Sequence, residues 1–268
     1  MSAGAGDSAI EGGGDDLVFT RDGFVATVRL NRPLKLNTIT PEMGQRLLTL
    51  VGEINNDDSI RAVILTGTGD RAFSAGSDIG ALDGYGTNWE LRNRVDYAKA
   101  LFAVRKPMIA SVRGYCIGGG LELALMCDVR FAAPGARFGA GEVKLGWNGG
   151  GGNTQLLPRL LGYGNAMKML LTGDLIDGAE AHRMGLVQEL ISDDLLDLHT
   201  LEFARRVAAN APIAVQGIKH LVRMSEGTSL EVGLAYENDF FAYCFTTRDS
   251  TEGRKAFAEK RAPQFEGR

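Results

Sequence analysis

Two glutamates and several glycine clusters are the residues of this sequence whose types and spacing could do chemistry. Glu122 stands in the stretch GGGLELALM (118–126), just after three glycines and among apolar residues. A carboxylate in so apolar a run must be paired, protonated or functional; an acid that stabilises a helix N-terminus is the alternative. Glu142 lies further along in an irregular stretch, where a carboxylate on its own is usually solvated. The pair is a candidate for acid–base chemistry.

A run of four glycines, Gly149 to Gly152, follows in the stretch GWNGGGGNTQ. Glycine adds backbone entropy that folding must remove, so the run needs a reason. A phosphate cradle, a hinge and a plain linker are the alternatives. No Lys or Arg stands within the run, and no G-x-x-x-x-G-K-[ST] motif occurs in the chain. Both observations weigh against a phosphate site.

The first half of the chain alternates strands and helices. Residues 17–33 predict a hairpin, because two β-rich runs flank the turn pair Asp22-Gly23. Pro41 opens a helical pattern with Thr40 as its cap. Further strands are expected at 62–67, 107–114 and 128–133, and further helices at 89–104 and 118–126. This alternation is typical of an α/β fold with parallel strands.

From Thr154 onward the pattern is mainly helical, with Gly and Pro between the periodic segments. Helices are expected at 156–161, 166–171, 178–184, 195–209, 213–224 and 230–245. The charged amphipathic segment STEGRKAFAEKRAP predicts a last helix that begins at Ser250 as its cap. The chain is therefore α/β first and mostly α afterwards.

Composition places the chain among ordinary globular proteins. Of its 268 residues 44% are hydrophobic, and the net charge of −4 gives no basic field for nucleic acid. Cysteines and histidines are scattered without metal spacing, so no metal site is expected. No apolar run reaches the roughly 18 residues of a membrane span. Residues 1–15, rich in Gly, Ser, Ala and Asp and unlike a signal peptide, predict a disordered tail and a cytoplasmic protein.

Several segments occur together in the order typical of one family. They are LNRPLKLNTIT, FSAGSD, GGGLELALMCD, FGAGEVKLG, GNTQLLPRLLG, LTGDLIDGAEAHRMGLVQEL and TEGRKAFAEKRAPQF. On these segments, which span roughly residues 17–267, the chain resembles the crotonase superfamily and, within it, the enoyl-CoA hydratase/isomerase family. Matches of this kind in one consistent order are highly specific.

The resemblance implies a fold and an assembly. Residues 16–195 would form an α/β core, a crotonase-like spiral of repeated ββα units. Residues 196–268 would form a helical C-terminal region that builds a homotrimer or a dimer of trimers. No separate cofactor is implied, because coenzyme A is part of the acyl-CoA thioester substrate. Neither nucleic acid nor membrane is an expected partner.

The resemblance also implies a reaction, the addition of water across the 2,3 double bond of an enoyl-CoA. Family members hold the thioester oxygen on two backbone N–H groups that stabilise an enolate-like oxyanion. These positions fall on Ser77 and Gly119, and the two catalytic glutamates of similar hydratases fall on Glu122 and Glu142. In the family's usual account, one carboxylate activates water at Cβ and the other delivers a proton at Cα. By this resemblance Glu122 would take the first role and Glu142 the second.

The same resemblance implies contacts for the rest of the substrate. The segment from Ser77 to Gly80 would run along the acyl-pantetheine portion, Lys35 and Leu36 would lie near the nucleotide end, and Lys260 would reach a CoA phosphate across a subunit boundary. A solvated surface charge is the alternative for either lysine. Trp147 is expected as a core residue or as a wall of the acyl pocket. The implied substrate-binding residues are Lys35, Leu36, Ala75, Ser77, Asp78, Ile79, Gly80, Trp147 and Lys260.

The chain departs from the family pattern around the glycine run. Gly141 stands where Pro usually precedes the second glutamate, residues 147–149 replace a stretch that usually contains Pro, and Asn153 replaces a Gly. Loss of Pro loosens a backbone, so we expect a pliable loop shaped for a particular acyl group. An enoyl-CoA isomerase, or a hydrolase that cleaves a C–C bond in a β-diketone or a ring, is the alternative on this scaffold. A non-catalytic or RNA-binding relative is disfavoured by both glutamates and the acidic charge.

Overall fold

Six strands form the larger of two sheets in the computed structural model, which describes residues 16–268; the tail predicted at 1–15 lies outside them. Their order is β1 (Leu17–Asp22), β2 (Val25–Leu30), β3 (Ala62–Gly67), β5 (Met108–Val112), β7 (Val129–Ala132) and β10 (Glu189–Leu190). β1 and β2 form the predicted antiparallel hairpin, and the remaining neighbours pair in parallel. Every residue of β3 is buried, as expected for a strand covered on both faces.

Four short strands form the second sheet, in the order β4 (Ala72–Ser74), β6 (Tyr115–Ile117), β8 (Arg137–Gly139) and β9 (Ile176–Asp177). β4 follows β3 along the chain, β6 follows β5 and β8 follows β7. Each such pair adds one parallel strand to each sheet, which confirms the expected spiral of repeated units. The sequence did not reveal these short strands, because three residues are too few for a clear alternation of apolar and polar side chains.

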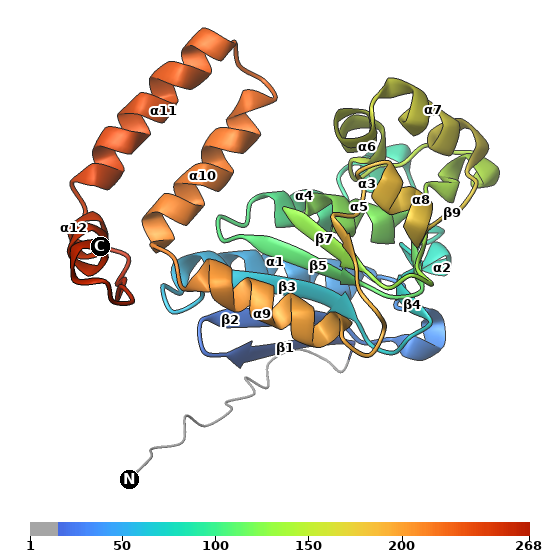
Figure 1. Ribbon diagram of the computed structural model, residues 1–268. Helices are drawn as coiled ribbons and strands as arrows, with labels where there is room; N and C mark the ends of the chain where they lie inside the picture. The colour runs from blue at the N-terminus through green and yellow to red at the C-terminus, as the bar shows by residue number, and fades with distance from the viewer. Residues whose placement is uncertain (1–15) are drawn as a thin grey trace.

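Helices cover both faces of the larger sheet. On one face α1 (Pro41–Asn56), α4 (Tyr97–Phe102) and α5 (Gly119–Met126) bury the main apolar core, and on the other α9 (Leu196–Ala208) packs across the strands (Figure 1). Thr40 caps α1 as predicted, because its side chain accepts a hydrogen bond from Met43 N at 3.2 Å. The sheets and these helices together support the two chain turns that lead to Ser77 and Gly119.

The helix expected at 89–104 is instead two helices, α3 (Asn88–Arg92) and α4, separated by residues 93–96. The side chains of Thr87 and Asp96 each cap one of them, so the chain carries two start signals in this region. The shorter elements nearby are η1 (Pro33–Lys35), α2 (Ile79–Leu82), η2 (Gly141–Leu145), α6 (Asn153–Leu161), α7 (Tyr163–Thr172) and α8 (Gly178–Arg183).

The last three helices are α10 (Pro212–Ser225), α11 (Leu230–Phe245) and α12 (Arg248–Glu259), and α10 and α11 stand as an antiparallel pair to one side of the sheets (Figure 1). Lys219 and Arg223 of α10 form ion pairs with Asp128 at 2.7 and 3.2 Å, which tie this pair to the core. The predicted Ser250 cap is wrong: Thr247 caps α12, and Ser250 N donates to it from the first turn. Between residues 16 and 268 no helix has the length and apolar character to cross a membrane.

Candidate active site

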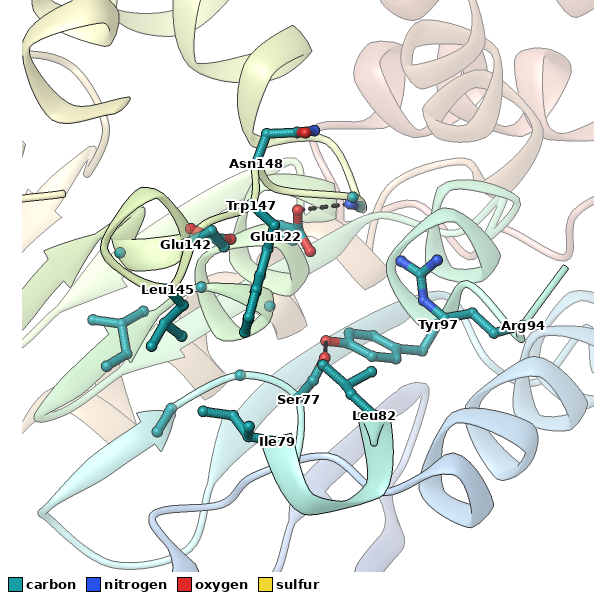
Figure 2. A pocket seen from close by; sticks show the side chains of 18 of the residues that line it. Ser77, Ile79, Leu82, Arg94, Tyr97, Glu122, Glu142, Leu145, Trp147 and Asn148 are labelled. Atoms are coloured by element: carbon teal, nitrogen blue, oxygen red, sulfur yellow. Dashed lines mark hydrogen bonds between the residues drawn. The ribbon is translucent and has the colours of Figure 1, made fainter. Parts of the chain in front are cut away.

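A cavity of about 720 Å³ lies between α2, α4, the start of α5, η2 and the glycine run (Figure 2). The predicted residues that line it together are Ala75, Ser77, Ile79, Gly119, Glu122, Glu142 and Trp147. In the view of Figure 2 both glutamates lie at the upper side of the cavity, Ser77 lies at the lower side, and the ring of Trp147 extends between them. The fold thus brings two carboxylates and two chain turns to one cavity.

Glu122 points from α5 into this cavity and is 5% exposed. Its Oε1 accepts a hydrogen bond from Gly151 N at 2.6 Å. Burial raises the pKa of Glu122 to about 7, and the nearby charge of Glu142 acts in the same direction, while the Gly151 N–H opposes them by stabilising the ionised form. A carboxylate with a pKa near neutrality is suited to accept a proton at physiological pH.

Glu142 enters the cavity from η2. Its Oε1 accepts a hydrogen bond from Asn153 Nδ2 at 2.9 Å, whereas its Oε2 is buried and has no partner among residues 16–268. Asn153 is fully buried at the first position of α6. The sequence marked Asn153 only as a departure from the family, and nothing in the local pattern predicted its contact with Glu142. One oxygen of Glu142 is therefore held and the other is free.

The glycine run packs its backbone directly against Glu122. A Cβ atom on Gly149 would lie 2.9 Å from Glu122 Oε1, and one on Gly151 would lie 2.5 Å from Glu122 Oε2. Only Gly152 in this run has a positive φ, +126°. The glycines are thus required chiefly because the backbone approaches a carboxylate closely. This reason differs from the phosphate cradle, the hinge and the plain linker that the sequence suggested for the run.

The turns at Ser77 and Gly119 present two unpaired backbone donors. Ile39 holds the first turn, since Ile39 N donates to Gly76 O at 2.8 Å and Asp78 N donates to Ile39 O at 2.9 Å. Within residues 16–268 the structure records no acceptor for the N–H of Ser77 or of Gly119. A Cβ atom on Gly76 would lie 2.8 Å from Gly119 N, so the two turns touch. Gly119 begins α5, where the helix dipole favours an anion.

Two further side chains line the cavity that the sequence analysis did not single out. Tyr97 projects from α4, and its hydroxyl lies 2.8 Å from Ser77 Oγ (Figure 2). Arg94 lies just before α4 and donates from Nη1 to Leu91 O at 2.9 Å. Both belong to the segment expected as one continuous helix: Arg94 lies in the break at 93–96, and Tyr97 is the first residue of α4 after it.

Several of the predicted substrate-binding residues lie outside the cavity. Asp78 accepts a hydrogen bond from Arg32 Nη1 at 3.1 Å, Lys35 ends η1, and Lys260 ends α12. Those that do not line the cavity are Lys35, Leu36, Asp78, Gly80 and Lys260. Trp147 is 42% exposed and lines the cavity, so the structure places it as a wall and not in the core.

Comparisons with known proteins identify the family. The family profile described as enoyl-CoA hydratase/isomerase matches residues 20–268. A short-chain-enoyl-CoA hydratase of Clostridium acetobutylicum is 37% identical, over 92% of this chain and 96% of the relative. A crotonyl-CoA hydratase of Syntrophomonas wolfei is 35% identical, over 94% of this chain and 98% of the relative.

The crystal structure of an enoyl-CoA hydratase from Bacillus anthracis superposes with a TM-score of 0.91 at 33% identity, over 94% of this chain and 100% of that one. Sequence, fold and the matched length all point the same way. The chain belongs to the enoyl-CoA hydratase/isomerase family of the crotonase superfamily.

Proposed function

We propose that the protein adds water across the 2,3 double bond of a 2-enoyl-CoA thioester. The observation that carries the proposal is that Glu122 and Glu142 share one cavity with the unpaired N–H groups of Ser77 and Gly119. Relatives of nearly full length that are named as hydratases support the same activity. One glutamate would be enough for some isomerisations, so the presence of two favours hydration.

The proposed reaction uses each group once. The N–H groups of Ser77 and Gly119 hold the thioester oxygen, which draws electrons from the double bond. The Glu122 carboxylate takes a proton from water as the water oxygen bonds to Cβ, and the Glu142 carboxyl gives a proton to Cα. Glu122 ends protonated and Glu142 ionised, and return of that proton to Glu142 through solvent completes the addition of one water.

The contacts of Glu142 fit its proposed role. Asn153 holds Oε1 and leaves Oε2 without a partner, so Oε2 is the oxygen that we assign to proton transfer at Cα. A buried carboxyl oxygen without a hydrogen bond costs free energy, and a role in the reaction would explain why the fold retains it. Asn153 is therefore a positioning residue for the proton donor.

The acyl group would lie against an apolar part of the cavity. Its walls include Ile79, Leu82, Leu91, Leu145 and Trp147. These side chains favour a hydrocarbon acyl chain, because they bury apolar surface without offering it a hydrogen bond. The flat ring of Trp147 would set how far a branched or cyclic group can extend.

We further propose self-association through the C-terminal helices. α11 has no buried residue although its sequence is largely apolar, and a monomer rarely leaves so much apolar surface exposed. Side chains exposed there and on α10 include Ile218, Val222, Leu230, Leu234, Phe241 and Phe245. The expected contact of Lys260 with a CoA phosphate of another subunit depends on this self-association.

Crotonyl-CoA tests the proposed function directly. Hydration removes the conjugated thioester, so its ultraviolet absorbance falls, and mass spectrometry shows the gain of one water. A product of unchanged mass would indicate isomerisation, and smaller products would indicate C–C cleavage. If neither crotonyl-CoA nor longer or cyclic enoyl-CoA thioesters gain water, the proposal is wrong.

A further inference from the structure

The hydroxyl groups of Tyr97 and Ser77 lie against the two backbone donors. Their oxygens are 2.8 Å apart, and both side chains line the cavity. A Cβ atom on Gly119 would overlap Tyr97 Oη and would lie 3.3 Å from Ser77 N. The Tyr97 hydroxyl therefore occupies the space beside the Gly119 backbone that the side chain of any other residue would fill.

One of the two hydroxyl protons of Tyr97 and Ser77 is not used in the hydrogen bond between them. Two hydroxyls carry two protons, and the bond between them uses one. For the part of the chain that the structure describes, no other hydrogen-bond partner is recorded for Tyr97 Oη or Ser77 Oγ. The remaining proton therefore faces the cavity without an acceptor.

The phenol is the better placed of the two to donate that proton. A phenol is more acidic than an aliphatic hydroxyl, so it donates more strongly to a developing negative charge. A hydrogen bond from Ser77 Oγ to the phenol oxygen strengthens the donation, because successive hydrogen bonds polarise one another. Burial raises the pKa of Tyr97, so its hydroxyl stays protonated at neutral pH.

We propose that Tyr97 Oη is a third hydrogen-bond donor to the thioester oxygen, and that Ser77 Oγ positions it by donating to the phenol oxygen. The proposal rests on the proposed function, because it needs the thioester oxygen at the N–H groups of Ser77 and Gly119. A donor of this kind acts mainly as charge develops, so it lowers the barrier more than it tightens substrate binding.

The kinetic test compares Tyr97→Phe, Ser77→Ala and the double variant on crotonyl-CoA. Tyr97→Phe should lower kcat by about tenfold to a hundredfold, somewhat less than the loss of a main oxyanion donor, with KM within about twofold. Ser77→Ala should lower kcat by about threefold, since the phenol keeps its proton but loses its polarising donor. Because Ser77 acts through Tyr97, the double variant should be no slower than Tyr97→Phe. Tyr163→Phe, 73% exposed on α7, is the matched control and should keep full activity.

A second readout needs no turnover. The absorption of 4-dimethylaminocinnamoyl-CoA moves to longer wavelength when its carbonyl oxygen is polarised, so the shift on binding reports the donors at that oxygen. The wild type should shift the band strongly and Tyr97→Phe less. A Tyr97-dependent shift in a protein that hydrates neither crotonyl-CoA nor longer or cyclic enoyl-CoA thioesters would refute hydration, while the hydrogen bond from Tyr97 to the bound thioester oxygen would still stand.

Three results would overturn the inference. A Tyr97→Phe variant with wild-type kcat and a wild-type band shift would remove Tyr97 from the oxyanion hole. A double variant whose loss equals the product of the single losses would show that Ser77 does not act through Tyr97. If thermal unfolding shows that Tyr97→Phe does not fold, Ser77→Ala is the test. An unchanged kcat and an unchanged band shift in Ser77→Ala would show that the two hydroxyl groups do not act on the thioester oxygen.

Discussion

Gly151→Ala is the substitution whose effect on Glu122 follows most directly from the structure. Its Cβ atom would lie 2.5 Å from Glu122 Oε2 and 2.9 Å from the Cβ atom of Ala98, which is fully buried and cannot move away. Ordinary van der Waals contact begins at 3.4 Å. The carboxylate must therefore move by about 0.9 Å, the difference between the two distances, unless the loop backbone moves instead.

Either movement disturbs the water-activating group. A misplacement of about 1 Å can cost about a hundredfold in rate, so kcat should fall about a hundredfold, equivalent to about 2.7 kcal/mol. The 2.6 Å hydrogen bond from Gly151 N to Glu122 Oε1 is strained by the same movement. Because that bond opposes the rise in the pKa of Glu122, its loss should move this pKa above about 7.

The assay is the loss of crotonyl-CoA absorbance as a function of pH. Gly52→Ala is the matched control, because Gly52 is exposed within α1 and a Cβ atom there meets no atom within 4 Å. That control should keep full activity and gain about 0.5–1 kcal/mol in stability from helix propensity. Wild-type kcat and an unmoved pH profile in Gly151→Ala would refute the argument that the glycine run is shaped by contact with Glu122.

Three further predictions concern the carboxylate pair. The kcat/KM of the wild type should fall as the pH drops through about 7, because water activation needs ionised Glu122. Glu122→Gln should stabilise the fold by about 3 kcal/mol at pH 8. Folding raises the pKa of Glu122 from 4.5 to about 7, so the free energy of unfolding of the wild type falls as the pH rises across that window, whereas Gln does not titrate. Equal denaturant midpoints for variant and wild type at pH 8 would contradict this. Asn153→Gly should lower kcat by about tenfold with little change in KM, because Glu142 Oε1 loses its donor; a change confined to KM would argue against a positioning role for Asn153.

The sequence predicted the parts of the fold that carry local signals. The hairpin at Asp22-Gly23, the capped start of α1 at Thr40 and the buried strand β3 each follow from a few adjacent residues. The strands of the small sheet do not, because their pairing is set by neighbours far along the chain. The boundary predicted at 195/196 stays a prediction; α9, which follows it, packs against the larger sheet.

Sequence reasoning reached part of the site for a similar physical reason. Glu122, Glu142, Ser77 and Gly119 sit in recognisable motifs, and all four line the cavity. The contacts that tune them join distant segments: Gly151 to Glu122, and Tyr97 to Ser77. No local sequence pattern predicts such contacts. The close approach of the glycine run to Glu122 is therefore visible only in the structure.

The most direct test of the account is the rate of crotonyl-CoA hydration by the wild type, Glu122→Gln and Glu142→Gln under identical conditions. The account predicts that the wild type adds water to the thioester. Each variant should fold, as shown by circular dichroism, and should hydrate it more slowly by about two to four orders of magnitude, as expected for the loss of an acid or base group. Full activity in either variant, or a folded wild type that hydrates no enoyl-CoA thioester, would contradict it.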